Sequence, residues 1–342
     1  ARAIYAMRHV EPASHGYSHP FYWHKFESSG GAEARLPVRD ATISSEREVA
    51  GSVRFLQKFT EKPLMVFLWT GEALPGAPRL KSASGAGLWN LNGGTTDITK
   101  MQPTLTRVGP ESRPVQGMLQ VYAPMLNENV YTNNWTGPFY GFRRLTETFD
   151  LTESPRRLKP MNIYYHFYSA TKEASLRALE FVYAEALKRR PIPTFVSRYA
   201  QSGVDGRKAR VAERIEGGFR VTPGARTVRL PDGFVPSSCT SRNLAGSEQS
   251  GPSRYAALGP GGAELSQGAA NCPQLIDSNV VVESVTRTGR RLEMVLSGPN
   301  AVEAVFAARS CSAVGARIRA KGGKVMLQTP RRSLRVRCEG AR

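Results

Sequence analysis

Long apolar runs are missing from this chain of 342 residues. The longest, residues 64–69, has the length of a single strand and is far too short to cross a bilayer as a helix. We therefore expect no transmembrane segment. A signal peptide is missing too, and the chain opens on Ala1 with residues typical of a domain interior, so we expect its natural start to lie upstream.

Acidic residues are scarce, because 28 Asp and Glu stand against 47 Lys and Arg and leave a formal net charge of +19. Such a charge favours polyanionic partners, namely nucleic acid, an acidic glycan or an anionic membrane surface. However, the sequence has no run of five or six consecutive basic residues and no nucleic-acid-binding motif. We expect scattered, solvated charges and no nucleic-acid partner.

Cysteine is absent before Cys239, and the spacing of the four cysteines matches no zinc-binding pattern. Two disulfides in an exported domain are the natural interpretation, and four buried free thiols are the alternative. The sequence leaves the pairing open. The candidates are Cys239, Cys272, Cys311 and Cys338.

Histidine is scarce as well, with five in the chain, four of them among residues 9–24 and the fifth at His166. His15 and His19 are four residues apart, so one turn brings their imidazoles to the same side, where they could bind one divalent metal. Pro20 disfavours helical geometry at His19, which predicts a short turn or loop. The alternative is that both are polar loop residues among aromatics.

The hydrophobic content of 40% is typical of a soluble globular protein, and the length predicts two domains. Residues 1–202 alternate helix and strand signals, which favours an α/β domain with a parallel sheet. We expect strands at 64–69, 119–123 and 163–168, a capping box at Ser45–Glu48, a long loop over 71–115, and a helix between Thr171 and Pro191. Residues 203–342 show short β-like runs, which predict an all-β sandwich with a loop over 243–270.

One motif resembles a known family. His-Gly-Tyr-Ser-His at residues 15–19 is similar to the second motif, His-Ser/Thr-x-x-His, of metal-dependent polysaccharide deacetylases of the NodB-homology type, which are carbohydrate esterases. Four longer stretches resemble the PelA-like branch of that family. They are residues 18–23, 67–71, 131–137 and 154–169.

The resemblance implies a partial (β/α) deacetylase barrel that removes N-acetyl groups from an N-acetylhexosamine exopolysaccharide during biofilm matrix biosynthesis. It implies a periplasmic or otherwise exported protein, a divalent metal with zinc expected, and other exopolysaccharide export proteins as partners. His15 and His19 would be metal ligands, and His166 would be the general acid that protonates the leaving amine. Substrate-binding residues would be Tyr17, Trp69, Thr70, Trp135, Met161, Ile163 and Tyr164, with Met161 and Ile163 beside the acetyl methyl group.

The chain departs from the family at one place. The family uses an aspartate pair from a strand upstream of the histidine motif, whereas here no aspartate precedes Asp40. We therefore expect the first barrel strand to be missing from this chain. Alternatively, the protein is a catalytically incomplete homologue that binds glycan or acts as a scaffold in polysaccharide export.

Overall fold

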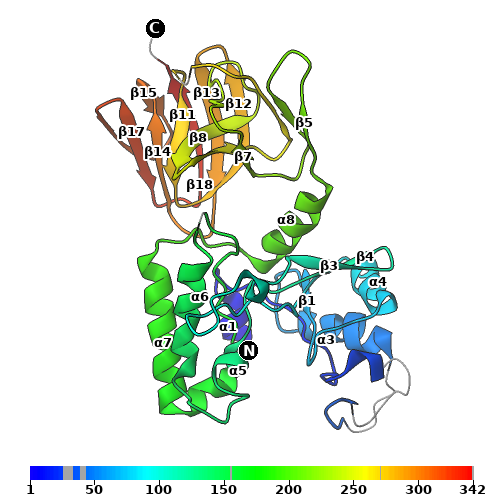
Figure 1. Cartoon of the computed structure of the whole chain (residues 1–342). Coiled ribbons are helices and arrows are strands. Elements are labelled where there is room, and N and C mark those ends of the chain that lie inside the picture. The colour runs from blue at the N-terminus through cyan, green and yellow to red at the C-terminus, as the bar shows by residue number, and fades with distance from the viewer. Residues whose placement is uncertain (26–33, 39–43, 155, 270, 341–342) are drawn as a thin grey trace. The chain divides into compact units, whose positions relative to one another are not determined.

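The computed structural model describes residues 1–25, 34–38, 44–154, 156–269 and 271–340 (Figure 1). The chain forms two compact units. The first comprises Ala1–Pro191 and Phe195–Gly203, and the second comprises Ile192–Thr194 and Val204–Arg342. No helix among the described residues is long and apolar enough to span a membrane.

The first unit mixes helices with a short parallel sheet. β1 (Val66–Leu68) pairs in parallel with β2 (Trp89–Leu91), and on its other edge Phe67 makes a parallel bridge to Ser14. Val66 and Phe67 are fully buried, as predicted for a strand covered on both faces. A parallel arrangement in a mixed fold is therefore present, and closure into a (β/α) barrel stays a prediction.

The other elements of the first unit are mostly short. In chain order they are α1 (Arg2–Ala6), η2 (Arg47–Gly51), α3 (Ser52–Gln57), α4 (Ala77–Gly85), η3 (Leu105–Arg107), β3 (Ser112–Val115), β4 (Met118–Val121), α5 (Glu128–Tyr131), η4 (Gly141–Arg144), α6 (Leu145–Leu151), η5 (Phe167–Thr171), α7 (Glu173–Lys188) and α8 (Val196–Lys208), the last of which continues into the second unit.

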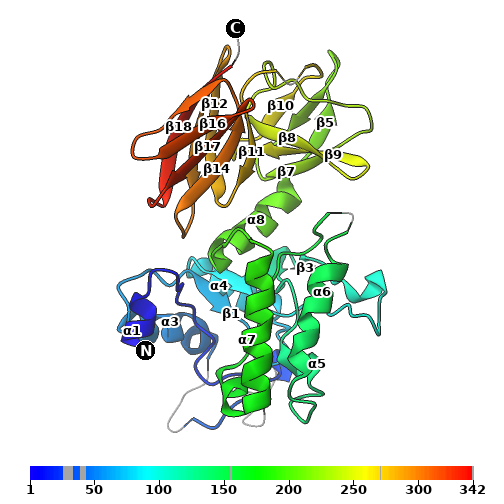
Figure 2. The same cartoon turned by 90° about the vertical axis from the view of Figure 1, so that its left-hand side faces the viewer.

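Two apolar clusters form the core of the first unit. One joins β1 and α4 and includes Trp23, Phe67 and Trp69. The other joins α6 and α7, which pack side by side, and includes Phe149 and Val182 (Figures 1 and 2). The predicted helix before Pro191 is confirmed as α7, although it begins at Glu173 without a side-chain cap from Thr171.

Three predictions about local structure in the first unit are wrong. The expected loop over 71–115 contains α4 and β2, because Leu80 and Ala83 of α4 bury an apolar face. Ser44, not Ser45, caps the turn before η2 by accepting a hydrogen bond from the N–H of Arg47. Residues 163–166 are extended but belong to no sheet, since the N–H of His166 donates to a side chain, Glu128.

The second unit consists of β-strands after the end of α8. They are β5 (Val211–Glu213), β6 (Phe219–Val221), β7 (Thr227–Leu230), β8 (Leu244–Ser250), β9 (Ser253–Leu258), β10 (Ala263–Leu265), β11 (Gln274–Ser278), β12 (Val281–Thr288), β13 (Arg291–Ser297), β14 (Val302–Ala307), β15 (Ser310–Ser312), β16 (Arg317–Lys321), β17 (Lys324–Thr329) and β18 (Ser333–Glu339).

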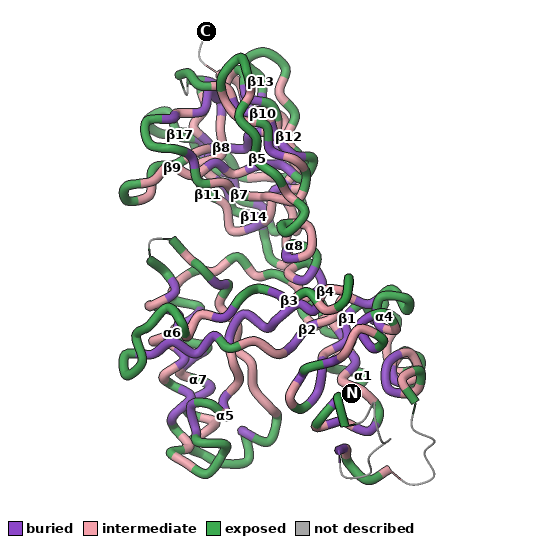
Figure 3. Tube along the Cα trace, turned by 45° about the vertical axis from the view of Figure 1, so that its right-hand side comes forward, coloured by how far each residue is buried: buried purple, intermediate pink, exposed green. Residues whose placement is uncertain are grey.

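The C-terminal strands form two antiparallel sheets around one core, which is a β-sandwich arrangement. The sheets run in the order β11-β14-β17-β16 and β12-β13-β18-β15. Buried residues alternate with partly or fully exposed ones along β13 and β17, so Met294 and Leu327 face the core. Figure 3 shows buried stretches of chain among the strands of this unit. The all-β character predicted for this region is confirmed.

The expected loop over 243–270 is wrong, because it contains β8, β9 and β10. Its small residues serve close packing. A Cβ on Gly246 of β8 would lie 2.0 Å from the carbonyl oxygen of Leu275 on β11, so only glycine fits there.

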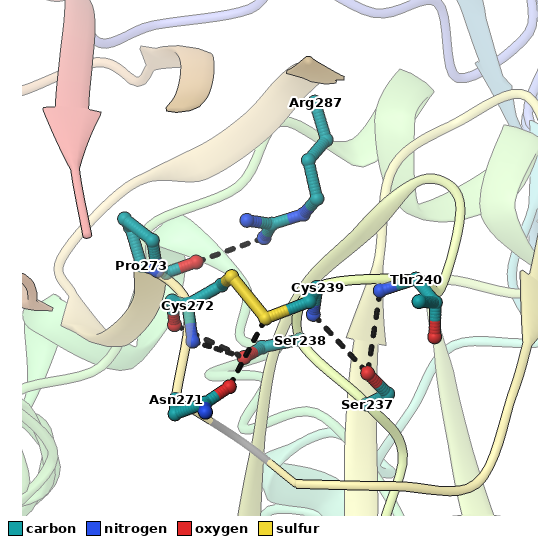
Figure 4. The surroundings of a disulfide bond; sticks show 8 residues. All are labelled: Ser237, Ser238, Cys239, Thr240, Asn271, Cys272, Pro273 and Arg287. Carbon is teal, nitrogen blue, oxygen red and sulfur yellow. Dashed lines mark hydrogen bonds between the residues drawn. A yellow bond between two sulfur atoms is a disulfide. The ribbon is translucent and has the colours of Figure 1, made fainter. Parts of the chain in front are cut away.

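The four cysteines form two disulfides in the second unit, Cys239–Cys272 and Cys311–Cys338. Around the first bond, the Ser238 hydroxyl accepts from the N–H of Cys272 at 2.9 Å and donates to the carbonyl of Cys272 at 3.0 Å (Figure 4). The second bond joins β15 to β18 within one sheet.

Removing the second disulfide should destabilise the protein. The double variant Cys311→Ala/Cys338→Ala should lose about 3 kcal/mol of unfolding free energy, because the bond spans a sequence separation of 27 and restricts the unfolded chain. Urea unfolding of the variant and of the oxidised wild type measures the loss. An unchanged midpoint in the variant would show that this bond contributes nothing.

Candidate functional site

Residues 14–19, which we call the histidine loop, bring two imidazoles together at the end of β1. The ring centroids of His15 and His19 lie 5.1 Å apart with an interplanar angle of 80°. Nδ1 of His15 donates a 2.8 Å hydrogen bond to the carbonyl of Leu68, which leaves Nε2 with its lone pair. The segment is irregular, as Pro20 predicted, and His19 has a φ of 52°.

A left-handed φ is uncommon for a residue other than glycine, so the surrounding contacts must hold His19 in place. The main contact is the buried carboxylate of Glu48 in η2. It accepts from the N–H of Tyr17 at 2.8 Å, from the N–H of Ser18 at 3.0 Å and from the Ser18 hydroxyl at 2.5 Å. Hydrogen bonds to a charged acceptor are among the stronger ones in proteins.

Trp69 and Thr70 hold the other end of this segment. The Thr70 hydroxyl donates to the carbonyl of Pro20 at 2.5 Å, and the Trp23 indole donates to the carbonyl of Thr70 at 3.1 Å. Trp69 is 1% exposed and donates its indole N–H to Asn90. Both residues are buried and stabilise the scaffold behind the histidine loop, and their contact with substrate stays a prediction.

His166 is oriented by a second buried carboxylate, Glu128 in α5. Nδ1 of His166 donates to Glu128 at 3.0 Å, and the N–H of His166 donates to the same carboxylate at 2.8 Å. The Ser169 hydroxyl adds a third hydrogen bond at 2.7 Å. Burial by itself raises the pKa of Glu128, but these hydrogen bonds outweigh it and lower the pKa. Nε2 is therefore the nitrogen of His166 that is left for chemistry.

The three histidines lie within electrostatic range of one another. Burial lowers the pKa of His15 to about 4; the hydrogen bond to Leu68 opposes this shift, and the charges of His19 and His166 add to it. Burial also lowers the pKa of His19, again with a contribution from His166. Both rings of the histidine loop are thus neutral near pH 7, which is the state that binds a metal.

Aromatic rings surround His166. Tyr168 stacks on it at 5.0 Å with an interplanar angle of 16°, Trp135 meets it edge-on at 5.4 Å, and Tyr164 lies at 6.0 Å. Trp135 is 37% exposed and ends a turn of three left-handed residues that begins at Asn133. A narrow cavity lined by Trp135, Glu128 and Ser169 opens beside this group.

Met161 and Ile163 do not face this site. They pack, together with Tyr165, against the cluster formed by α6 and α7. In an extended segment alternate residues point to opposite sides, so Tyr164 and His166 face the other way. Met161 and Ile163 thus have a packing role in this structure, and their place beside the acetyl group stays a prediction.

Tyr17 lies on the rim of the histidine loop and is 38% exposed. The guanidinium of Arg47 lies 4.4 Å from the centroid of its ring and donates a 3.0 Å hydrogen bond to its hydroxyl. Tyr17 is therefore accessible to a ligand, as a substrate-binding role requires.

The histidine loop fits a divalent metal in part. His15 and His19 supply two imidazoles, and Nδ1 of His19 is buried with no hydrogen-bond partner among the described residues. The Nδ1 bond of His15 to a backbone carbonyl is typical of a metal-bound histidine. A catalytic zinc usually has three protein ligands, and the described residues contain no group of three that could hold a metal. Asp40 lies outside the described residues.

The sequence interpretation missed the two carboxylates that position the histidines. Glu48 was assigned to a capping box with Ser45, and Glu128 was not singled out. One signal was available for Glu48, because it precedes Val49 on the apolar face of its helix, where a charged residue is unusual. Glu128 follows Asn127, the N-cap of a short helix, and carries no comparable signal.

Comparison with known proteins adds no relative: no family model, no curated protein and no solved structure matches the chain. The functional assignment consequently depends on the residues described above.

Replacing Glu48 should loosen the histidine loop. Glu48→Gln removes the charge that accepts three hydrogen bonds, so we expect a loss of about 1–3 kcal/mol in unfolding free energy, measured by urea denaturation. Glu46→Gln is the matched control, because Glu46 precedes the same π-helix, is 63% exposed and forms a surface ion pair with Arg54. Equal losses in the two variants would contradict the anchoring role of Glu48.

The neutral state of His15 makes stability depend on pH. The unfolded chain binds a proton at His15 below its ordinary pKa of 6.5, whereas the folded protein does so only near pH 4. The unfolding free energy should therefore fall as the pH drops through this window, with a contribution from His15 of up to about 3 kcal/mol. Urea unfolding of wild type and of His15→Asn, measured above and below this pH window with chelator present to remove metal, tests this expectation. The variant should lose less stability, and identical losses would contradict the assignment.

Proposed function

We propose that the protein is a metal-dependent N-deacetylase that acts on an N-acetylhexosamine polysaccharide. The observation that carries the proposal is the convergence of His15, His19 and His166, with His166 backed by the buried Glu128. Support also comes from the likeness of residues 15–19 and 154–169 to PelA-like deacetylases. A partial (β/α) barrel and a role in biofilm exopolysaccharide biosynthesis belong to the same proposal.

Hydrolysis of an N-acetyl group adds water across the C–N bond, so the oxygen leaves in acetate and the nitrogen must gain a proton. His166 is proposed as the donor of that proton through Nε2, because Nδ1 is engaged by Glu128. The carboxylate of Glu128 fixes the His166 ring through Nδ1 and the His166 backbone through its N–H. Glu128 is thus a positioning residue for His166.

His15 and His19 would hold the metal together with a ligand from outside the described residues. When bound, a zinc ion would lower the pKa of a water molecule and polarise the acetyl carbonyl. Trp135 and Tyr168 would receive a sugar ring, since both are partly exposed beside His166. The two disulfides support an exported location, because cytosolic proteins rarely contain them.

Acetate release tests this function. Zinc-supplemented protein should release acetate from N-acetylglucosamine or N-acetylgalactosamine oligomers, and His166→Gln should lower kcat by about 10²–10⁴-fold because the general acid is lost. His24→Gln is a matched control, since His24 forms a similar pair with Glu72 at 2.9 Å but is 63% exposed. An inactive wild type, or an equal loss in both variants, would contradict the proposal.

A second candidate function is glycan binding without chemistry. The aromatic group around His166 favours it, because Trp135 and Tyr168 can stack on a sugar without any metal. The two functions differ in their response to chelator. Oligomer binding that is unchanged by chelator, in a protein that releases no acetate, would establish the scaffold role. Binding that disappears with chelator would exclude it.

A further inference from the structure

The two sheets of the C-terminal sandwich differ in the charges that they present to solvent. On β13 and β18 two of the three outward-facing arginines lie opposite acids: Arg291 faces Glu339 and Arg337 faces Glu293, with nitrogen–oxygen distances of 2.7 and 2.8 Å. Each of these two cations is neutralised by its cross-strand neighbour. The third, Arg335, lies opposite Val295. These two strands therefore present two neutralised pairs and a single further cation, Arg335, to a partner.

The outer face of the other sheet carries a basic row at one edge, which we call the basic edge. β16 is the last strand of the sheet, and all of its residues, Arg317–Lys321, are exposed. Its register places Arg319 opposite Met326 and Lys321 opposite Lys324 on β17. Because directly opposite residues share a face, the basic edge comprises Arg317, Arg319, Lys321 and Lys324.

These four cations have no acidic neighbour across the strands. Arg317 lies opposite Gln328, and no ion pair to any of the four is found among the described residues. The acids on this face are Glu303 on β14 and Asp277 on β11. β14 is separated from β16 by β17, so Glu303 is about 10 Å away from Arg317 at strand spacing. Lys324 lies on β17, where its neighbour on β14 is Ala307.

We propose that the basic edge binds an extended acidic polysaccharide. Arg317, Arg319 and Lys321 are alternate residues of one strand and so recur at intervals of about 7 Å, which suits a polymer with regularly repeated charges. Guanidinium groups pair with carboxylates in a two-pronged geometry, which favours uronic acid units. The proposal does not depend on the deacetylase function, whose cationic product this surface would repel.

Two other uses of the surface fit less well. Single-stranded nucleic acid is bound through aromatic side chains that stack on bases, and neither β16 nor β17 contains an aromatic residue. Edge strands also carry charges merely to prevent pairing with other chains. That role alone predicts no affinity for any polyanion.

Calorimetric titration of the full-length chain with polygalacturonate at low salt tests the proposal. Wild type should bind, added salt should weaken binding, and neutral dextran should not bind. Arg317→Gln/Arg319→Gln should weaken binding about fivefold, since two exposed charge contacts are lost. Arg317→Lys/Arg319→Lys should bind more tightly than the glutamine variant but less tightly than wild type, because the charges remain while the two-pronged geometry is lost. Thermal unfolding should show that both variants are folded.

The matched control is Arg291→Gln/Arg337→Gln, which removes the two neutralised arginines from the other sheet of the same sandwich. It should bind like wild type. Equal weakening in the two glutamine variants would show that only the net charge of the protein matters, and this would overturn the proposal. The absence of binding in wild type would overturn it too. A DNA oligonucleotide that binds more tightly than polygalacturonate through Arg317 and Arg319 would overturn it in favour of nucleic acid.

Discussion

The site depends on two buried carboxylates, each of which fixes a histidine segment through the backbone. Glu48 accepts hydrogen bonds from the main chain and the serine of the histidine loop, and Glu128 accepts from the main chain of His166 and from Ser169. A buried carboxylate is costly unless such donors satisfy it. The free-energy cost of leaving such a carboxylate without donors also holds the two segments in place. If either segment moved, its hydrogen-bond donors would lose their charged partner.

Two of the few acidic residues in this chain of net charge +19, Glu48 and Glu128, thus position the histidines. Glu48 belongs to the part of the first unit that packs around β1, whereas Glu128 belongs to the part that packs around α7. The three histidines come from segments anchored on two different apolar clusters, and the charge of His166 acts on both His15 and His19. The core behind each ring sets the ring's surroundings. His15 and His19 are neutral because they are buried, whereas His166 lies beside the ionised carboxylate of Glu128.

The sequence predicted the parts of this structure that depend on local pattern. The apolar run around Phe67, the amphipathic helix α7 and the irregular turn before Pro20 follow from periodicity and backbone sterics. The strand predicted over 163–168 is absent, because the N–H of His166 donates to Glu128 and not to a partner strand. Glu48 and Glu128 escaped prediction because their partners are 30 and 38 residues away in sequence, and only packing brings them together. The loop predicted over 243–270 was wrong for the same reason. Glycine is required at Gly246 by close contact with a distant strand and not by a turn.

The central claim is that His15 and His19 form one metal site, distinct from the exposed histidines. Imidazole ¹H–¹⁵N correlation spectra of the full-length protein, recorded during a zinc titration, test it directly. The account predicts that the signals of His15 and His19 change together and saturate at one equivalent, while His24 is unaffected. Signals of His15 and His19 that stay unchanged, or that move only together with that of His24, would contradict it.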